Sequence, residues 1–404
     1  MLPRGRSKST RCLNPLMAEL VFWQNTPSIH QAPFIREVAR RWVGRVITVA
    51  ETDVSDSRRS QGWKRPDFGL AELLLVPDRE RRNALIERSA AHECVHVFSG
   101  LRAYPETVWT MTQVARTPAR MVVFLEPLAI HDGLRVPLRK VAYRYSALRW
   151  RKRLAFVLVT GTRGAKQYQN LGMPEELLFP FAYSVQSPVE LGRQGGATTE
   201  RGFGVRLLFV GKLVARKGVD LLLQALTRLS EHAWALDVVG DGPLRPQLQQ
   251  MAETCGIQDR VRWRGNLENS EVRSLMAETD ILVLPSRYDG WGAVVNEALA
   301  AGARALVSDA CGSSDLLETR RHHGRVFRAG SVRSLEHALE EMLLEGRTTP
   351  ESRREIVAWA EETISPRTLA AYFLEILASR KSRSRRPQAP WLSAEHAENR
   401  GLQG

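Results

Sequence analysis

The feature that most constrains this chain is an alternation of short apolar runs with segments of helical periodicity, which continues along most of its length. In the first half the apolar runs have strand length, and the segments between them repeat apolar residues at helical spacing. Strand, helix and strand in that order are typical of a parallel sheet covered on both faces. The expected strands of this half are 20–23, 46–50, 73–76, 95–98, 121–125 and 155–159, and the expected helices are 33–42, 79–91, 106–116 and 134–149.

The alternation stops in residues 184–204, which are rich in Gly, Ser and Thr and have no periodicity, so we expect a linker there. It then resumes. The expected strands of the second half are 206–210, 236–239, 261–263, 281–284 and 305–308, and the expected helices are 218–229, 243–255, 270–278 and 292–301. The pattern therefore predicts an α/β chain with two tandem, doubly wound, Rossmann-like domains. Such sheets bind ligands at the carboxyl ends of their strands, which here would face a cleft between the domains.

The length of 404 residues agrees with two domains of about 150 residues each. We expect a disordered leader at the N-terminus, where the residues are polar and Arg-rich. We also expect a disordered tail at the C-terminus, where the residues are strongly basic. The predicted division is a leader at 1–18, a first domain at 19–183, the linker at 184–204, a second domain at 205–365, a helix at 366–379 and a disordered basic tail at 380–404.

Composition narrows the classes of protein. With 43% hydrophobic and 25% charged residues the chain is globular, and its net charge of +14 favours anionic partners such as nucleotides, nucleic acid or an acidic membrane surface. Four cysteines far apart in sequence fit a cytoplasmic protein without a zinc motif. His92 and His96 have the spacing of metal ligands, but a helix end followed by a strand would not bring them together, so we expect no metal site.

The strongest motif is PSRYDGWGAVVNEALAAG, residues 285–302. It begins where a buried strand ends, continues through a glycine turn and opens a helix, so free backbone N–H groups would lie at the carboxyl edge of the sheet. Such a site suits a diphosphate. Two carboxylates, Asp289 and Glu297, flank the turn and suit hydrogen bonds from sugar hydroxyls. The turn itself consists of Gly290, Trp291 and Gly292.

Two further strand–loop–helix corners accompany this motif. In VGKLVARKGVDLLLQAL, residues 210–226, the loop carries Gly211, Lys212, Arg216 and Lys217, and these cations can hold phosphate oxygens from a second side. The alternative is an ordinary solvated cluster of charges. In VVGDGPLRPQL, residues 238–248, two glycines permit a tight turn, although many αβ turns look similar.

In this order and at this spacing the three segments resemble the C-terminal domain of retaining glycosyltransferases of the GT-B fold, glycosyltransferase family four (glycosyl transferases group 1). The family signature of two glutamates separated by seven residues reads Asp289 and Glu297 here, so its first position is one methylene shorter. The phosphate clamp of the family reads Gly211-Lys212 and Lys217-Gly218. The resemblance covers residues 206–317.

The resemblance implies roles for these residues. Glu297 would bind the nucleotide ribose, Asp289 would bind a hydroxyl of the transferred sugar, and Lys212 and Lys217 would bind the diphosphate and offset charge on the leaving nucleotide. The second domain would then be the donor-binding domain. The nucleotide sugar is a substrate, so no cofactor is implied and no metal requirement is expected.

The first half resembles the acceptor-binding domain of the same family less closely. His30 lies in the first strand–loop–helix corner, where many members have a Gly-Gly pair, and Glu126 follows a strand where many members have His. Both are acceptor-side candidates, and we add Glu126 to Asp289, Lys212 and Lys217 as a catalytic candidate. Retaining enzymes of this fold are thought to react on one face of the sugar, so no nucleophile is assigned.

The sequence thus predicts transfer of a sugar from a nucleotide-sugar donor to a glycan or lipid-linked saccharide, with retention, in cell-surface polysaccharide or glycolipid biosynthesis. Two alternatives stay open. A non-catalytic nucleotide-sugar-binding protein would keep the donor motifs, and a basic nucleic-acid-binding protein would explain the charge. No zinc finger or compact basic domain supports the second, so no nucleic-acid partner is expected.

Residues 135–153 carry eight basic residues and no acidic one, with interleaved aromatic residues. A basic, aromatic helix suits an anionic membrane surface, and the alternative is a solvated helix that covers the first sheet. We expect a cytoplasmic protein that binds peripherally to the inner face of the plasma membrane.

Overall fold

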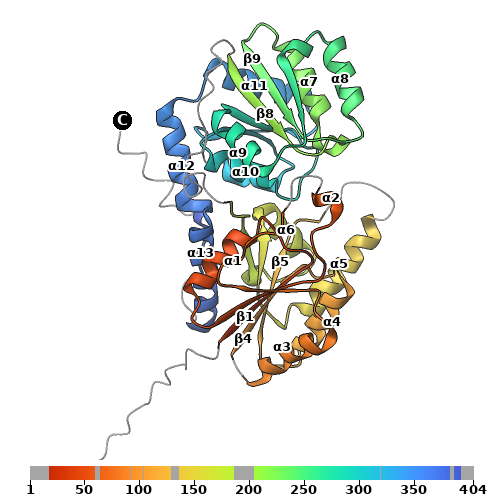
Figure 1. Ribbon diagram of the computed structural model, residues 1–404, viewed down its shortest axis with the longest axis vertical. Coiled ribbons are helices and arrows are strands. Elements are labelled where there is room, and N and C mark those ends of the chain that lie inside the picture. Colours follow the sequence, from red (N-terminus) through yellow and green to blue (C-terminus); the bar gives the residue numbers. More distant parts are fainter. Residues whose placement is uncertain are drawn as a thin grey trace, which may run out of the picture.

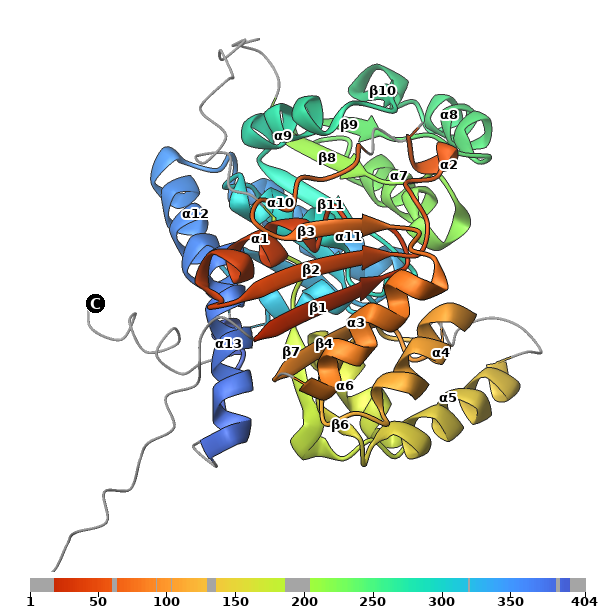
Figure 2. The same ribbon diagram turned by 60° about the horizontal axis from the view of Figure 1, so that its bottom comes forward.

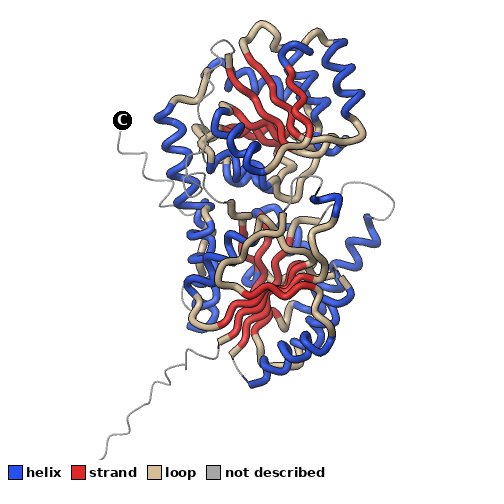
Figure 3. Tube along the Cα trace, viewed as in Figure 1, coloured by secondary structure: helices blue, strands red, loops and turns tan. Residues whose placement is uncertain are grey.

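The protein folds into two α/β domains stacked along the long axis, as a computed structural model shows (Figure 1). The structure describes residues 18–59, 64–91, 93–102, 104–128, 136–185, 204–318, 320–382 and 386–392. Residues 1–17 of the predicted leader and residues 186–203 of the predicted linker lie outside this range. Each domain is a parallel sheet with helices on both faces (Figure 3), which confirms the predicted fold class.

The first domain has a seven-stranded sheet in the order β3-β2-β1-β4-β5-β6-β7. Its strands are β1 (Glu19–Gln24), β2 (Arg45–Ala50), β3 (Glu72–Leu75), β4 (Cys94–Ser99), β5 (Arg120–Leu125), β6 (Leu154–Thr160) and β7 (Leu178–Phe181). Its helices are α1 (Ala32–Arg41), α2 (Asp56–Arg59), α3 (Arg79–Ala91), α4 (Pro105–Val114), α5 (Val136–Trp150) and α6 (Gly161–Asn170). Figure 2 shows the strands of this sheet running alongside one another with α3 and α4 on one face.

The second domain has a six-stranded sheet in the order β10-β9-β8-β11-β12-β13. Its strands are β8 (Val205–Val210), β9 (Trp234–Val239), β10 (Val261–Gly265), β11 (Ile281–Leu284), β12 (Arg304–Ser308) and β13 (Gly324–Phe327). Its helices are α7 (Val219–Arg228), α8 (Arg245–Thr254), α9 (Asn269–Glu278), α10 (Ala293–Ala300), α11 (Val332–Leu344) and α12 (Pro350–Ile364).

All the predicted strands overlap observed ones, but β7 and β13 were not predicted. Both are four-residue strands at an edge of their sheet. Pro180 lies within β7, and Pro is tolerated there because an edge strand can leave one backbone position without a ladder hydrogen bond. Such strands are too short and too interrupted for a periodicity of two to be visible.

The last long helix, α13 (Pro366–Ser382), leaves the second domain and packs beside α1 of the first (Figure 1). Its Phe373 is fully buried in an aromatic cluster of the first domain. The ring centroid of Phe373 lies 5.5 Å from that of Phe34, 6.1 Å from that of Phe22 and 6.0 Å from that of Phe156. The helix therefore joins the two domains through its contacts with α1 and α12.

The prediction of a disordered tail over 380–404 is wrong for its middle part. Helix α13 continues to Ser382, and residues 386–392 are packed, ending in a 3₁₀ turn, η6 (Pro390–Leu392). Ala389 and Trp391 are only 2% and 4% exposed. The prediction failed because it was based on the basic composition of the segment and gave no weight to these two apolar residues. Their burial orders the segment. Residues 383–385 and 393–404 lie outside the described part of the chain.

If α13 holds the two domains together, Phe373→Ala should lower the free energy of unfolding by about 3–5 kcal/mol, the usual cost of truncating a buried aromatic side chain. Thermal and denaturant unfolding measure this change. Leu344→Ala on α11 is the control, because Leu344 is 72% exposed and its loss should change stability by only about 0.5 kcal/mol. Equal changes in the free energy of unfolding for the two substitutions would contradict a role of α13 in holding the domains together.

Candidate active site

The turn after β11 determines the backbone geometry at the carboxyl edge of the second domain's sheet. Gly292 is the N-cap of α10 and has a left-handed backbone with φ of 87°. A Cβ atom there would lie 2.6 Å from Leu284 Cδ2, so a side chain is excluded by space as well as by backbone conformation. Helix α10 begins at Ala293, and the N–H groups of its first turn have no partner within the helix. N–H groups in this position, at the carboxyl edge of the sheet, are suited to an anion.

This helix start opens on a cavity of about 540 Å³, called here the donor-side pocket after the role that the sequence predicts for its residues. It lies at the carboxyl ends of β8, β9 and β10, as expected for a doubly wound sheet. At one of its corners Gly240, with φ of 122°, lets the backbone approach closely, since a Cβ there would lie 2.0 Å from the Gly211 carbonyl oxygen. Lining residues from the predicted motifs are Gly211, Lys212, Lys217, Gly240, Gly242, Asp289, Gly292 and Glu297.

The charges of this pocket are partly paired. The Lys217 ammonium forms an ion pair with Asp289, and both side chains are about 85% buried, at 13% and 15% exposure. Arg216 approaches the same carboxylate at 3.9 Å, but its side chain is 54% exposed. In the described part of the chain no ion pair to Lys212 is present. A diphosphate that enters the pocket would therefore meet Lys212 directly and Lys217 together with its counter-charge.

Glu297 projects from the second turn of α10 into the same pocket. Its carboxylate accepts no hydrogen bond from any of the described residues. Burial raises the pKa of Glu297 to about 7, and the charge of Arg273 opposes this rise. A desolvated carboxylate that lacks donors is suited to bind the hydroxyl groups of a ligand.

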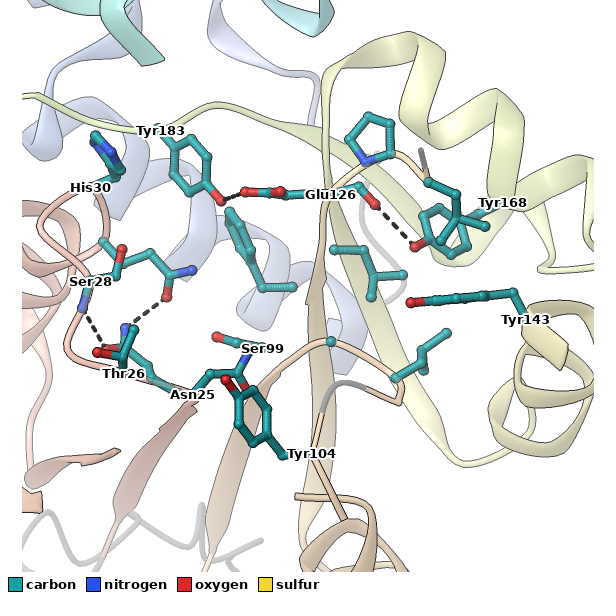
Figure 4. A pocket seen from close by; sticks show the side chains of 18 of the residues that line it. Asn25, Thr26, Ser28, His30, Ser99, Tyr104, Glu126, Tyr143, Tyr168 and Tyr183 are labelled. Atoms are coloured by element: carbon teal, nitrogen blue, oxygen red, sulfur yellow. Dashed lines mark hydrogen bonds between the residues drawn. The ribbon is translucent and has the colours of Figure 1, made fainter. Parts of the chain in front are cut away.

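The first domain has a second cavity of about 470 Å³ at the carboxyl ends of β1, β4 and β5, called here the acceptor-side pocket (Figure 4). It is polar and aromatic. In Figure 4, Glu126 and Tyr183 point toward one another across its upper part, while Tyr104 and Ser99 close its lower part. Its labelled lining residues are Asn25, Thr26, Ser28, His30, Ser99, Tyr104, Glu126, Tyr143, Tyr168 and Tyr183.

Glu126, which follows β5, has its carboxylate at the boundary between the two domains. Tyr183 Oη donates to Glu126 Oε1, and Tyr168 Oη donates to the Glu126 carbonyl oxygen at 3.1 Å. Burial and the adjacent Glu126 raise the pKa of Tyr183 well above its usual value, so the phenol stays a donor. On the other side, a Cβ atom on Gly290 would lie 3.5 Å from Glu126 Oε2. The acceptor-side carboxylate therefore faces the glycine turn of the donor side.

Direct contacts between the domains surround this point. Thr162, at the start of α6, donates from its N–H and its Oγ1 to Asp315 at 2.5 and 2.9 Å. Burial raises the pKa of Asp315 to about 6, and the two hydrogen bonds from Thr162 act in the opposite direction. Tyr288 Oη donates to the Pro127 carbonyl oxygen at 3.0 Å. His30 lines both pockets, so the two cavities adjoin at its side chain.

The structure brings most of the predicted site residues together, with four differences. Trp291 does not line the donor-side pocket, because its indole is 2% exposed and donates to Asn296 Oδ1 at 2.8 Å. Gly290 faces Glu126 instead of the pocket. Arg216 is turned to the surface, where it donates to the Tyr288 carbonyl oxygen at 3.4 Å. His30, assigned to the acceptor side, reaches the donor side as well.

Several site residues had no recognisable signal in the sequence. Tyr183 follows a strand that was not predicted, and Tyr168, Asn296 and Asp315 act through partners far away in the sequence. His96 is buried on β4, where it accepts from Trp23 Nε1 at 3.0 Å, and burial lowers its pKa to about 3. His92 lies outside the described residues. No group of three or more potential metal ligands occurs in the part of the chain that the structure describes.

Comparison with known proteins finds a family match over the second domain. Residues 202–385 match the family model described as Glycosyl transferases group 1. The chain is 26% identical over 200 residues to alpha-D-kanosaminyltransferase of Streptomyces kanamyceticus, which is 48% of this chain and 51% of that protein. It is 30% identical over 145 residues to a GDP-mannose-dependent alpha-(1-6)-phosphatidylinositol monomannoside mannosyltransferase of Mycobacterium tuberculosis, which is 34% of this chain and 37% of that protein. The chain spans about half or less of the length of these relatives.

Solved structures extend the likeness to both domains. The Anabaena protein HepE in complex with UDP superposes with a TM-score of 0.64 at 15% identity, over 89% of this chain and all of that one. A glycosyltransferase from Rickettsia africae gives a TM-score of 0.64 at 13% identity, over 91% of this chain and all of that one. At these identities the likeness concerns the fold. The two Rossmann-like domains share the GT-B fold of these structures, and residues 202–385 match the Glycosyl transferases group 1 model.

The raised pKa of Glu297 has a consequence for stability. Its native pKa of about 7 exceeds the usual value of 4.5, so the native state binds more protons between these values and stability falls as pH rises through this range. Glu297→Gln should therefore raise the melting temperature at pH 8 but not at pH 4. Thermal unfolding across this range measures the difference. An equal melting temperature of the two proteins at pH 8 would contradict a desolvated carboxylate.

The Lys217–Asp289 pair makes a second prediction. Asp289→Asn removes the charge that offsets Lys217, so a nucleoside diphosphate should bind more tightly, by about 1 kcal/mol or less. Calorimetry at low and high salt measures the gain, which should shrink with salt. Asp220→Asn is the control, because Asp220 pairs with Arg287 outside the pocket. Weaker binding by Asp289→Asn would show that the carboxylate itself contacts the nucleotide.

Proposed function

We propose that this protein transfers a sugar from a nucleotide-sugar donor to a hydroxyl group of a glycan or lipid-linked saccharide, with retention of configuration. The observation that carries the proposal is that two pockets adjoin at His30, while Glu126 of one pocket faces the glycine turn beside the other. One pocket offers lysines and a helix N-terminus to a diphosphate. The other offers tyrosines and a carboxylate to a saccharide. HepE, the similar protein from Anabaena, binds UDP, which supports a nucleotide-sugar donor for this chain.

In this proposal the nucleotide lies in the donor-side pocket, with its ribose hydroxyls on Glu297 and its diphosphate on Lys212, Lys217 and the start of α10. The acceptor lies in the other pocket, where Glu126 accepts a hydrogen bond from the attacking hydroxyl. The bond between the anomeric carbon and the phosphate oxygen breaks while the acceptor oxygen bonds to that carbon on the same face, and the proton of the acceptor hydroxyl passes to the Glu126 carboxylate. The lysines stabilise the charge that develops on the leaving diphosphate, and Asp289 lies between them and the sugar.

The role of Glu126 has a direct test. Glu126→Gln keeps an oxygen that accepts from Tyr183 but loses the negative charge, so kcat should fall about 100- to 10,000-fold while nucleotide affinity stays the same. Tyr183→Phe is the companion variant. It keeps the carboxylate and removes one of its hydrogen bonds, so its effect should be smaller. An unchanged kcat in Glu126→Gln, with an identified donor and acceptor, would exclude Glu126 from the reaction.

Nucleotide binding is expected to need no metal ion, because lysines and helix N–H groups already face the phosphates. A nucleoside diphosphate at 100 times its dissociation constant should add about 2.7 kcal/mol to stability. Thermal shifts with UDP, GDP and ADP, each with EDTA and with Mg²⁺, test this and show which base is preferred. Stabilisation that appears with Mg²⁺ and disappears with EDTA would contradict the proposed mode of binding.

We also propose that α5 places the protein on an anionic membrane surface, where a lipid-linked acceptor would be found. Apolar side chains are exposed next to basic ones on this helix: Leu138 is 72%, Val141 66% and Tyr145 64% exposed. Lys140 and Arg144 lie beside them and are exposed as well. Each basic residue near such a surface contributes about 1 kcal/mol. Among the described residues, no helix has the length and apolar character to cross a membrane.

Lys140→Glu with Arg144→Glu should therefore release the protein from vesicles that contain phosphatidylserine, without altering nucleotide binding. Arg139 is left unchanged because it lines the acceptor-side pocket. The matched control is Arg333→Glu with Arg354→Glu in the second domain, which changes the net charge equally. Equal sedimentation of both double variants with the vesicles would show that α5 is a solvated helix that covers the first sheet and does not bind the membrane.

A further inference from the structure

The C-terminal segment, defined as residues 386–392, contacts both domains. At its start, the Arg386 guanidinium donates to the carbonyl oxygens of Glu175 and Leu178, the first at 3.1 Å, and lies 4.9 Å from the ring centroid of Phe179. These three residues belong to the first domain, at and before β7. At its end, Trp391 is 4% exposed and belongs to the same core as Trp291 of the second domain.

Trp391 packs against Trp291, the tryptophan of the glycine turn. The two ring centroids are 6.4 Å apart and the planes are inclined by 58°. Both rings are almost completely buried. Trp391, which lies in the predicted basic tail, therefore packs against a loop of the predicted donor site about 100 positions earlier in the chain.

The other neighbours of the Trp291 ring include glycines. A Cβ atom on Gly312 would lie 3.0 Å from Trp291 Cε3, and one on Gly161 would lie 3.3 Å from Trp291 Cζ3. The glycine backbone leaves room for the ring. Because glycine has no side chain, these residues cannot fill a space that opens beside the ring. The indole N–H is fixed by Asn296 Oδ1 at 2.8 Å. Trp391 is thus a large side chain beside a ring whose other neighbours include glycine backbone. Its loss would leave a cavity beside Trp291.

The position of the Trp291 ring determines the position of the donor loop, defined as residues 289–294. Trp291 lies between Gly290, which faces Glu126, and Gly292, which caps α10. Asp289, Gly292, Ala293 and Val294 line the donor-side pocket. A rotation of the indole into a cavity would shift the backbone on both sides of Trp291, including the N–H groups at the helix start. A site of this kind depends on geometry held by supporting residues.

We propose that Trp391 is a positioning residue for the donor loop and acts through Trp291, without touching the substrate. The effect on nucleotide binding rests on the proposed function, whereas the effect on the loop does not. Two measurements separate these parts: hydrogen exchange of the loop in the protein without ligand, and affinity for the nucleoside diphosphate that binds best among UDP, GDP and ADP.

The test compares Trp391→Ala with Trp234→Ala in the full chain. Trp234, at the start of β9, is the matched control because it is 1% exposed and belongs to a separate core of the second domain, which includes neither Trp391 nor the donor loop. Both substitutions create a large cavity and should lower the melting temperature. Only Trp391→Ala should increase hydrogen exchange in a peptide that covers residues 289–294.

The same variant should weaken diphosphate binding about tenfold. Trp391→Phe should restore both the slow exchange and the affinity, because a ring again fills the space. If Trp391→Ala does not fold, Trp391→Leu replaces it in every comparison. Equal exchange of the donor loop in the two tryptophan variants would overturn the proposal. If the wild-type protein binds no nucleoside diphosphate, the proposed function fails, and the exchange comparison still decides the role of Trp391.

Discussion

The left-handed backbone at Gly292 is the constraint on which the rest of the site depends. At this residue the chain that leaves β11 reverses into α10, and space beside Leu284 admits no side chain there. The turn has two consequences. The helix start is directed into the donor-side pocket, and Trp291 is directed the opposite way into the core. One short loop thus combines a helix start that is suited to an anion with a buried tryptophan, which under our proposal keeps that helix start in position.

The anchoring extends to the first domain. Asn296 accepts from Trp291 Nε1 and donates from Nδ2 to the Tyr183 carbonyl oxygen at 2.7 Å. Tyr183 in turn donates from its hydroxyl to Glu126, whose carboxylate faces Gly290. A continuous set of contacts therefore runs from the core behind the donor loop to the carboxylate in front of it. Displacement of the loop would alter both pockets together, which suits a reaction whose two substrates must meet at one carbon atom.

The sequence predicted the elements that repeat and the motifs that are local. Strands such as β11 and the turn from Asp289 to Gly292 follow from apolar runs and glycines that lie within a few residues of one another. What could not be predicted depends on distant partners. The ion pair between Lys217 and Asp289 joins positions 72 residues apart, and the contact between Trp391 and Trp291 joins two motifs that look unrelated. Trp291 was assigned to the ligand because its position in the motif gives no information on which side of the turn the indole lies.

The same reasoning explains why the strongly basic composition misled at one end of the chain. Charge density predicts whether a segment can be solvated, but two or three buried apolar residues suffice to order a short segment if a surface with matching shape exists. Residues 386–392 pack on a surface to which β7 of the first domain and α12 and the donor loop of the second all contribute. The order of this segment is therefore a property of the joint between the domains, and it links the integrity of that joint to the geometry of the donor loop.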